Sequence, residues 1–127
     1  MQENHLFEYA VIRVVPRVER EEFLNVGVIV FCSKENFLQT KYLVNKKKIK
    51  NLFTHFDPHL LEKNLKAFER ICKGDKKAGY IATLPMSERF GWLTATRSTI
   101  LQISKVHSGL CENAETTLEK LFKELVL

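Results

Sequence analysis

The chain has 127 residues, of which 45% are hydrophobic and 28% are charged, and its formal net charge is +5. This size and composition predict one soluble globular domain over residues 1–127 and exclude wholesale disorder. The longest apolar run is far below the roughly 18 residues of a membrane span, and MQENHLFEYA lacks the pattern of a signal peptide, so we expect a cytoplasmic protein without membrane contact.

The first predicted elements are two strands, Tyr9–Val15 and Val26–Phe31, joined by a charged segment. Both runs are rich in Val and Ile, with Tyr or Phe, and such residues suit a pleated, half-buried surface. Pro16 has no N–H to give to a strand pair, so it marks the end of the first run. The pattern predicts an antiparallel pair with a long polar connection.

A third strand is predicted at Phe37–Val44, where β-forming residues alternate, and a short helix at Asn45–Phe53. A longer helix is predicted at Pro58–Lys73, because Asp57 can cap its start and Gly74 can end it. The apolar face of this helix consists of Leu61, Leu65, Phe68 and Cys72.

The second half of the chain has weaker patterns. Tyr80–Leu84 fits a short edge strand or extended chain, Met86–Ala95 begins with a helical turn, and Arg97–Val106 alternates as a strand that Ser108 and Gly109 end. Asn113 can cap a final helix. Together the elements predict an α+β domain with an antiparallel sheet of about four strands and the two main helices packed on one face.

Metal and cofactor motifs are not indicated. The three cysteines are odd in number and widely spaced, so they predict neither a disulfide framework nor a zinc knuckle. His55, Asp57 and His59 lie close together, but Pro58 starts a helix between the two histidines and prevents the spacing of a helical metal pair. We expect no bound metal and no cofactor.

Two stretches together resemble a known family. The first reads Y-x-V-x-R-x-V-P and then E-x-x-N-V-G-V-x-V-F, and the second reads ERFGWLTATRSTILQISKVHSGL. They are similar to a bacterial family catalogued as domain of unknown function number three thousand and thirty-seven. The resemblance implies no activity. Members are often encoded beside HipA-like kinases, which implies a toxin–antitoxin-like setting with a kinase-like protein as partner.

The first candidate cluster consists of Arg13, Glu22, Asn25 and Gly27. A guanidinium, a carboxylate and an amide on two adjacent strands could position a ligand or a proton transfer. A structural interpretation is also open, in which Glu22 pairs with Arg13, Asn25 hydrogen-bonds the turn, and Gly27 marks a bulge or a close backbone approach.

The second candidate cluster is a ligand or anion site composed of Arg89, Trp92, Arg97, Ser98, Thr99 and His107. Arginine offers a planar set of donors for phosphate or carboxylate, the hydroxyls add donors, and the histidine can carry a proton near neutral pH. The structural alternative is a core tryptophan, an arginine that joins sheet and loop, and a polar loop histidine.

Basic residues concentrate between positions 41 and 77, where Lys46, Lys47, Lys48 and Lys50 form the densest group. Such a segment is either a solvated face or a footprint for nucleic acid or another polyanion.

Three classes of function therefore remain. The first is a non-enzymatic interaction or regulatory module with a HipA-like kinase as the expected partner, and an exposed edge strand could also pair two copies in a homodimer. The second is a nucleic-acid or polyanion binder, and the third is a small enzyme acting on a phosphorylated or nucleotide substrate.

Overall fold

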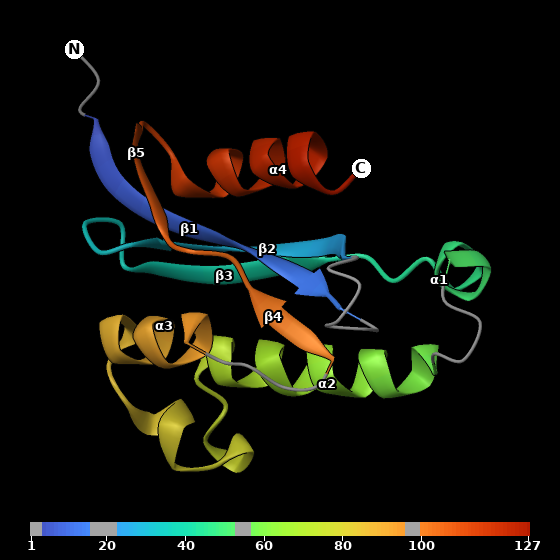
Figure 1. The fold of residues 1–127 in the computed structure, drawn as a ribbon. Helices are drawn as coiled ribbons and strands as arrows, with labels where there is room; N and C mark the ends of the chain where they lie inside the picture. The colour runs from blue at the N-terminus through green and yellow to red at the C-terminus, as the bar shows by residue number, and fades with distance from the viewer. Residues whose placement is uncertain (1–3, 16–22, 53–56, 96–99) are drawn as a thin grey trace.

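The computed structural model describes residues 4–15, 23–52, 57–95 and 100–127. Figure 1 shows the strands in one sheet between helices. The elements in chain order are β1 (His5–Val14), β2 (Leu24–Cys32), β3 (Phe37–Tyr42), α1 (Lys46–Leu52), α2 (Pro58–Lys73), the 3-10 helices η2 (Lys76–Ala78) and η3 (Tyr80–Thr83), α3 (Met86–Thr94), β4 (Leu101–Ile103), β5 (His107–Cys111) and α4 (Ala114–Leu125).

The sheet is antiparallel throughout, in the order β3-β2-β1-β4, and β5 also pairs with β1. β4 pairs with residues 12–14 of β1 and β5 pairs with residues 5–9, so the two short strands follow each other along the same edge. This arrangement confirms the α+β class and the antiparallel sheet. Among the described residues, no helix combines the length and the apolar character that crossing a membrane requires.

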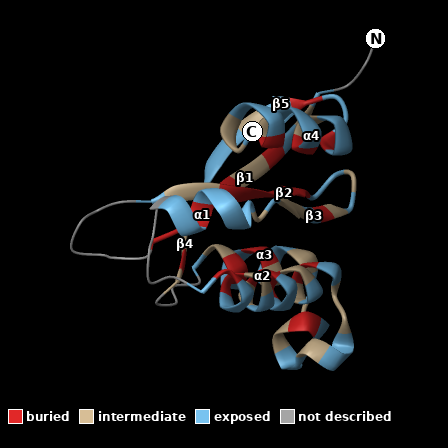
Figure 2. Cartoon of the chain, turned by 90° about the vertical axis from the view of Figure 1, so that its right-hand side faces the viewer, coloured by how far each residue is buried: buried red, intermediate tan, exposed pale blue. Residues whose placement is uncertain are grey.

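The central strand β2 is buried on both faces, because every residue from Val26 to Cys32 is buried. Ile29 and Phe31 join a core that includes residues of α2 and α3, while Val28 and Val30 join a second core that includes residues of α4. Figure 2 shows these buried strands between the two helical layers.

The two main helices therefore lie on opposite faces of the sheet, which corrects the expectation that they share one face. α2 and α3 cover one face and α4 covers the other (Figure 1). The physical reason is the uninterrupted apolar run of β2: side chains of a strand alternate between faces, so a strand without polar positions needs cover on both.

The helix ends follow the predicted chemistry. Asp57 accepts a hydrogen bond from the His59 N–H at 2.9 Å, and Gly74 ends α2 in the left-handed conformation with a φ of 76°. Asn113 caps α4 by accepting from the Thr116 N–H at 2.9 Å. The bounds predicted for α2 are confirmed, and so are the short helix at α1 and the third strand at β3.

Two segments differ from the elements predicted for them. Tyr80–Thr83 is a 3-10 helix and not a strand, and the strand expected over Arg97–Val106 is interrupted after Ile103 and resumes as β5. β5 passes through Ser108 and Gly109, which had been expected to end it. Glycine is suited to this position because a Cβ at Gly109 would lie 2.8 Å from Cε1 of Phe7 on the neighbouring strand.

Ser104 bridges the interruption between β4 and β5. Its backbone N–H donates to the Val11 carbonyl at 2.9 Å, and its hydroxyl oxygen accepts from the Val11 N–H at 2.8 Å. The hydroxyl thus satisfies a buried backbone donor of β1 where the strand ladder is broken. Ser104 is 6% exposed and is the buried polar side chain among the residues described.

Replacing Ser104 with alanine should lower the free energy of unfolding by about 1–3 kcal/mol, because the buried Val11 N–H loses its acceptor. Urea denaturation of the variant and the parent measures this difference. Ser108→Ala, at an exposed position of β5, is the matched control and should change stability by less than about 0.5 kcal/mol. Equal effects of the two substitutions would contradict the bridging role of Ser104.

Candidate functional site

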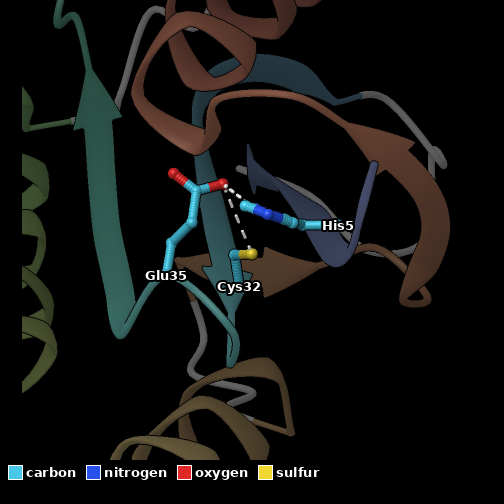
Figure 3. Close-up of side chains that lie close together, drawn as sticks. All are labelled: His5, Cys32 and Glu35. Carbon is cyan, nitrogen blue, oxygen red and sulfur yellow. Dashed lines mark hydrogen bonds and ion pairs between the residues drawn. The ribbon is translucent and has the colours of Figure 1, made fainter. Parts of the chain in front are cut away.

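Glu35 is the centre of a group of reactive side chains in the described structure. It lies in the tight turn between β2 and β3, which the Asn36 N–H closes by donating to the Ser33 carbonyl at 3.0 Å. Asn36 has a φ of 52°, in the left-handed region that asparagine tolerates better than most residues. Figure 3 shows the Glu35 carboxylate directed toward His5 and Cys32.

One carboxylate oxygen of Glu35, Oε2, lies near donors from several segments. His5 Nδ1 is at 3.0 Å, Cys32 Sγ at 3.6 Å and Cys111 Sγ at 3.8 Å. The Ala114 N–H at the start of α4 donates to both carboxylate oxygens, with distances of 3.0 and 3.1 Å. We call His5, Cys32, Glu35 and Cys111 the Glu35 cluster.

The sheet register explains why these residues meet. His5 and Cys111 are cross-strand partners at the ends of β1 and β5. Cys32 is the last residue of β2, and the turn that follows brings Glu35 back toward the same end of the sheet. The cluster therefore joins β1, β2, β5 and the start of α4.

The electrostatic setting favours a charged carboxylate at position 35. Hydrogen bonds from His5 and from the Ala114 N–H lower the pKa of Glu35 below its ordinary value. The start of α4 also carries the positive end of the helix dipole. The pKa of Cys111 is raised, chiefly by burial, which favours its neutral thiol form.

The cluster is reachable from one side. The side chains of His5 and Glu35 are 19% and 21% exposed, whereas Cys32 is fully buried. Ligand atoms of His5, Cys32 and Glu35 all lie within 4.8 Å of one another, so these three residues could hold a metal ion. Sequence reasoning missed the site because its members come from separate segments and share no spacing motif.

The members of the predicted anion site are only partly described. Arg97, Ser98 and Thr99 lie outside the described residues. Arg89 is in α3, where its Nη1 donates to the Leu84 carbonyl at 2.6 Å and its guanidinium lies beside the end of α2 at Gly74. This position places a cation at the negative end of the α2 dipole.

The other two described members of that site lie apart. Trp92 is on α3 and is 45% exposed. His107 is on β5, with its ring 5.2 Å from the ring of Tyr9, which packs against the core on the α4 side. Arg89 and Trp92 thus share a helix, and the sheet separates them from His107.

The predicted strand cluster is partly brought together. Arg13 and Asn25 are cross-strand partners, and Asn25 Nδ2 donates to the Leu125 carbonyl at 3.0 Å. The Arg13 guanidinium lies 4.6 Å from the centre of the Phe23 ring. Among the residues that the structure describes, Arg13 Nε and Asn25 Oδ1 are buried without a hydrogen-bond partner. Glu22 lies outside the described residues.

Gly27 does not join Arg13 and Asn25. A Cβ at this position would lie 2.8 Å from Cβ of Tyr42 and 2.9 Å from the Lys41 carbonyl oxygen, so β3 approaches β2 at a distance that only glycine permits. The register of β1 and β2 also shifts beside it, between Ile12 and Arg13. Both features fit the structural interpretation of this glycine.

The predicted lysine group lies on α1 and is solvent-exposed. Lys46 pairs with Glu62 of α2 at 3.3 Å. An open hollow between α1 and the start of α2 is lined by Lys46, Lys47, Lys50, Asp57, Pro58 and His59. Lys48 lines a neighbouring hollow with Lys47 and two asparagines.

Fold and site together define a small α+β domain whose antiparallel sheet is covered on both faces, with a His–Cys–Glu cluster at one end. The chain belongs to the family described as protein of unknown function (DUF3037), whose model matches residues 9–126. This match confirms the resemblance found in the sequence. Comparison with curated proteins and with solved structures gave no match.

Replacing Glu35 with glutamine should destabilise the protein by about 1–2 kcal/mol at neutral pH, because hydrogen bonds to a charged acceptor become neutral ones. The folded pKa of Glu35 is lowered, so its contribution is complete above the unfolded pKa of about 4.3 and is lost as the pH falls through the folded pKa.

Urea denaturation of both proteins between neutral and acidic pH, with a chelator present, measures this contribution. The difference in unfolding free energy between parent and variant should shrink at acidic pH. Arg70 also lowers the pKa of Asp75. Because Asp75 is present in both proteins, its contribution cancels in the difference between their unfolding free energies. A difference that stays constant with pH would contradict the charged state of Glu35.

Proposed function

We propose that this domain is a non-enzymatic interaction module that binds an extended segment of a partner protein along β5. The observation that carries the proposal is the position of β5 at the edge of the sheet. β5 pairs with β1 on one side, and no described strand pairs with its other side. An unpaired strand edge offers backbone donors and acceptors to an incoming strand.

Exposed apolar side chains accompany this edge. Leu6 of β1 and Leu110 of β5 are cross-strand partners and are 62% and 66% exposed. Val106, immediately before β5, is 38% exposed. Directly opposed residues in an antiparallel pair have their Cβ atoms about 5 Å apart, so the two leucines form one apolar patch beside the free edge. We call this surface the β5 edge.

The β5 edge fits a partner segment with apolar residues at alternate positions. In strand addition, backbone hydrogen bonds supply affinity and alternate side chains supply specificity. The resemblance to families encoded beside HipA-like kinases makes such a kinase the partner that we propose. A second copy of this chain, paired through the same edge, is the competing occupant.

The enzyme alternative has less support from the described residues. It needs Arg89 and Arg97 as an anion clamp, with Glu22 or His107 as acid or base. Arg89 already donates to the Leu84 carbonyl, and His107 lies on the α4 side of the sheet. The described members of the proposed clamp are therefore not assembled around one cavity.

Leu110→Lys should weaken binding to a HipA-like kinase of the same organism by about 10- to 100-fold, because it removes one buried leucine from the interface and adds a charge to a strand edge. Isothermal titration with the purified kinase measures the affinity. Leu60→Lys, on the exposed side of α2 where Leu60 is 46% exposed, is the control and should bind as the parent does.

Failure of the parent protein and the kinase to co-elute at micromolar concentration would overturn the kinase proposal. A dimer of the parent that Leu110→Lys converts to monomer would instead assign the β5 edge to self-association.

A second candidate function, polyanion binding, is favoured by a stripe of basic residues along the outer side of α2. The stripe consists of His59, Lys63, Lys66, Arg70 and Lys73, which repeat every three or four residues and are all exposed. From His59 to Lys73 the stripe extends about 21 Å along the helix axis. Among the described residues, no carboxylate lies within ion-pair distance of Lys63 or Lys66. The lysines of α1 extend this basic surface at the start of α2.

The double variant Lys63→Glu, Lys66→Glu should lose at least about tenfold affinity for duplex or single-stranded oligonucleotides, and the slope of log affinity against log salt should fall by about two. Fluorescence anisotropy at several salt concentrations measures both quantities. Lys105→Glu, Lys120→Glu makes the same change of net charge elsewhere on the surface and serves as control. Equal losses in both variants, or no binding by the parent, would remove this candidate.

A further inference from the structure

We propose that the Glu35 cluster is a zinc site, with His5, Cys32 and Glu35 as ligands and Cys111 as the fourth. Histidine nitrogen, cysteine thiolate and carboxylate oxygen are the three ligand types that Zn²⁺ takes from proteins. The site is independent of the β5 edge proposal, since it rests on the convergence of these side chains and not on any partner.

Two distances between ligand atoms are close to those of tetrahedral zinc. With Zn–N and Zn–O bonds of about 2.0–2.1 Å and Zn–S bonds of about 2.3 Å, the edges of a tetrahedron are about 3.3 Å between N and O and about 3.6 Å between S and O. The observed separations from Glu35 Oε2 are 3.0 Å for His5 Nδ1 and 3.6 Å for Cys32 Sγ. These two separations are close to the zinc values, and the ligand atoms of His5 and Cys32 lie within 4.8 Å of each other.

Cys111 lies outside the group of three residues whose ligand atoms are all within 4.8 Å of one another, so its side chain must move toward them to complete the coordination. Its Sγ lies 3.8 Å from the same oxygen, close to the S–O edge of about 3.6 Å. It is also the cross-strand partner of His5, so the backbones that carry these two ligands are held in register. Four protein ligands are the pattern of a structural zinc site.

A backbone hydrogen bond holds the Glu35 carboxylate in place. The Ala114 N–H lies 3.1 Å from Glu35 Oε1, so it can orient the carboxylate while Oε2 binds the ion. Hydrogen bonds of this kind fix ligand orientation in metal sites. The buried sulfur of Cys32 and the partly exposed His5 and Glu35 give the cluster a sheltered interior and an open side for entry.

Zinc binding converts the thiols of Cys32 and Cys111 to thiolates, and their two protons pass to the buffer. The ion then replaces the thiol hydrogen bonds to Glu35 with metal–ligand bonds. Because the ligands lie on β1, β2, the turn after β2 and β5, the ion would hold these segments together at one end of the sheet. The expected role is structural and not catalytic.

The test is a competition titration of the chelator-treated full chain with Zn²⁺ and a chromophoric chelator, together with the absorption spectrum of the Co²⁺-loaded protein. We expect one ion per chain and a thiolate-to-Co²⁺ charge-transfer band. Cys32→Ser should lose the band intensity of one thiolate and at least about 100-fold in zinc affinity, since loss of second-shell partners alone costs about 10- to 100-fold.

Two further variants keep the outcome decisive. Cys72→Ser replaces a buried cysteine of the other core and should leave zinc affinity and spectrum unchanged. Glu35→Gln retains an acceptor for the Ala114 N–H but is a weak zinc ligand, so it should lose affinity while its circular dichroism stays that of the parent. Absence of tight zinc binding by the parent, or equal losses in Cys72→Ser and Cys32→Ser, would show that the cluster is only a hydrogen-bonded contact between segments.

Discussion

The burial of β2 on both faces is the constraint on which the rest of the structure depends. A strand whose residues from Val26 to Cys32 are all buried needs an apolar layer on each side. α2 and α3 supply one layer, and α4 supplies the other from the opposite end of the chain. The chain reaches α4 through β5, which pairs with β1. The free edge of β5 and the Glu35 cluster at the end of β5 both result from this path of the chain.

The sequence predicted the local structure well because local chemistry sets it: Asp57 and Gly74 bound α2, and Asn113 starts α4. The placement of the two helices was wrong, although the unbroken apolar run of β2 indicates two covered faces. The break at Ser104 could not be predicted, because alternation continues through it and the hydroxyl acts on a backbone group 93 positions away. The family was identified from motifs, and the family model confirms it.

The sheet decides which residues of the candidate sites lie together. Arg13 and Asn25 meet because they are register partners, whereas Arg89 and His107 are separated by the sheet. The Glu35 cluster depends on register, turn geometry and the start of α4 together. Its members lie in separate segments between His5 and Cys111, so they share no spacing motif. It stabilises the end of β5, and β5 carries the surface that we propose for a partner. One end of the sheet therefore contains both the Glu35 cluster and the exposed pair of Leu6 and Leu110.

The central functional claim is that a partner protein adds a strand to β5. Amide hydrogen exchange of this chain, alone and with a HipA-like kinase, tests it most directly, because exchange reports protection of individual backbone segments. The account predicts new protection over residues 106–111, which contain β5, and unchanged exchange along α2. Protection confined to α2, or none on addition of the kinase, would contradict it.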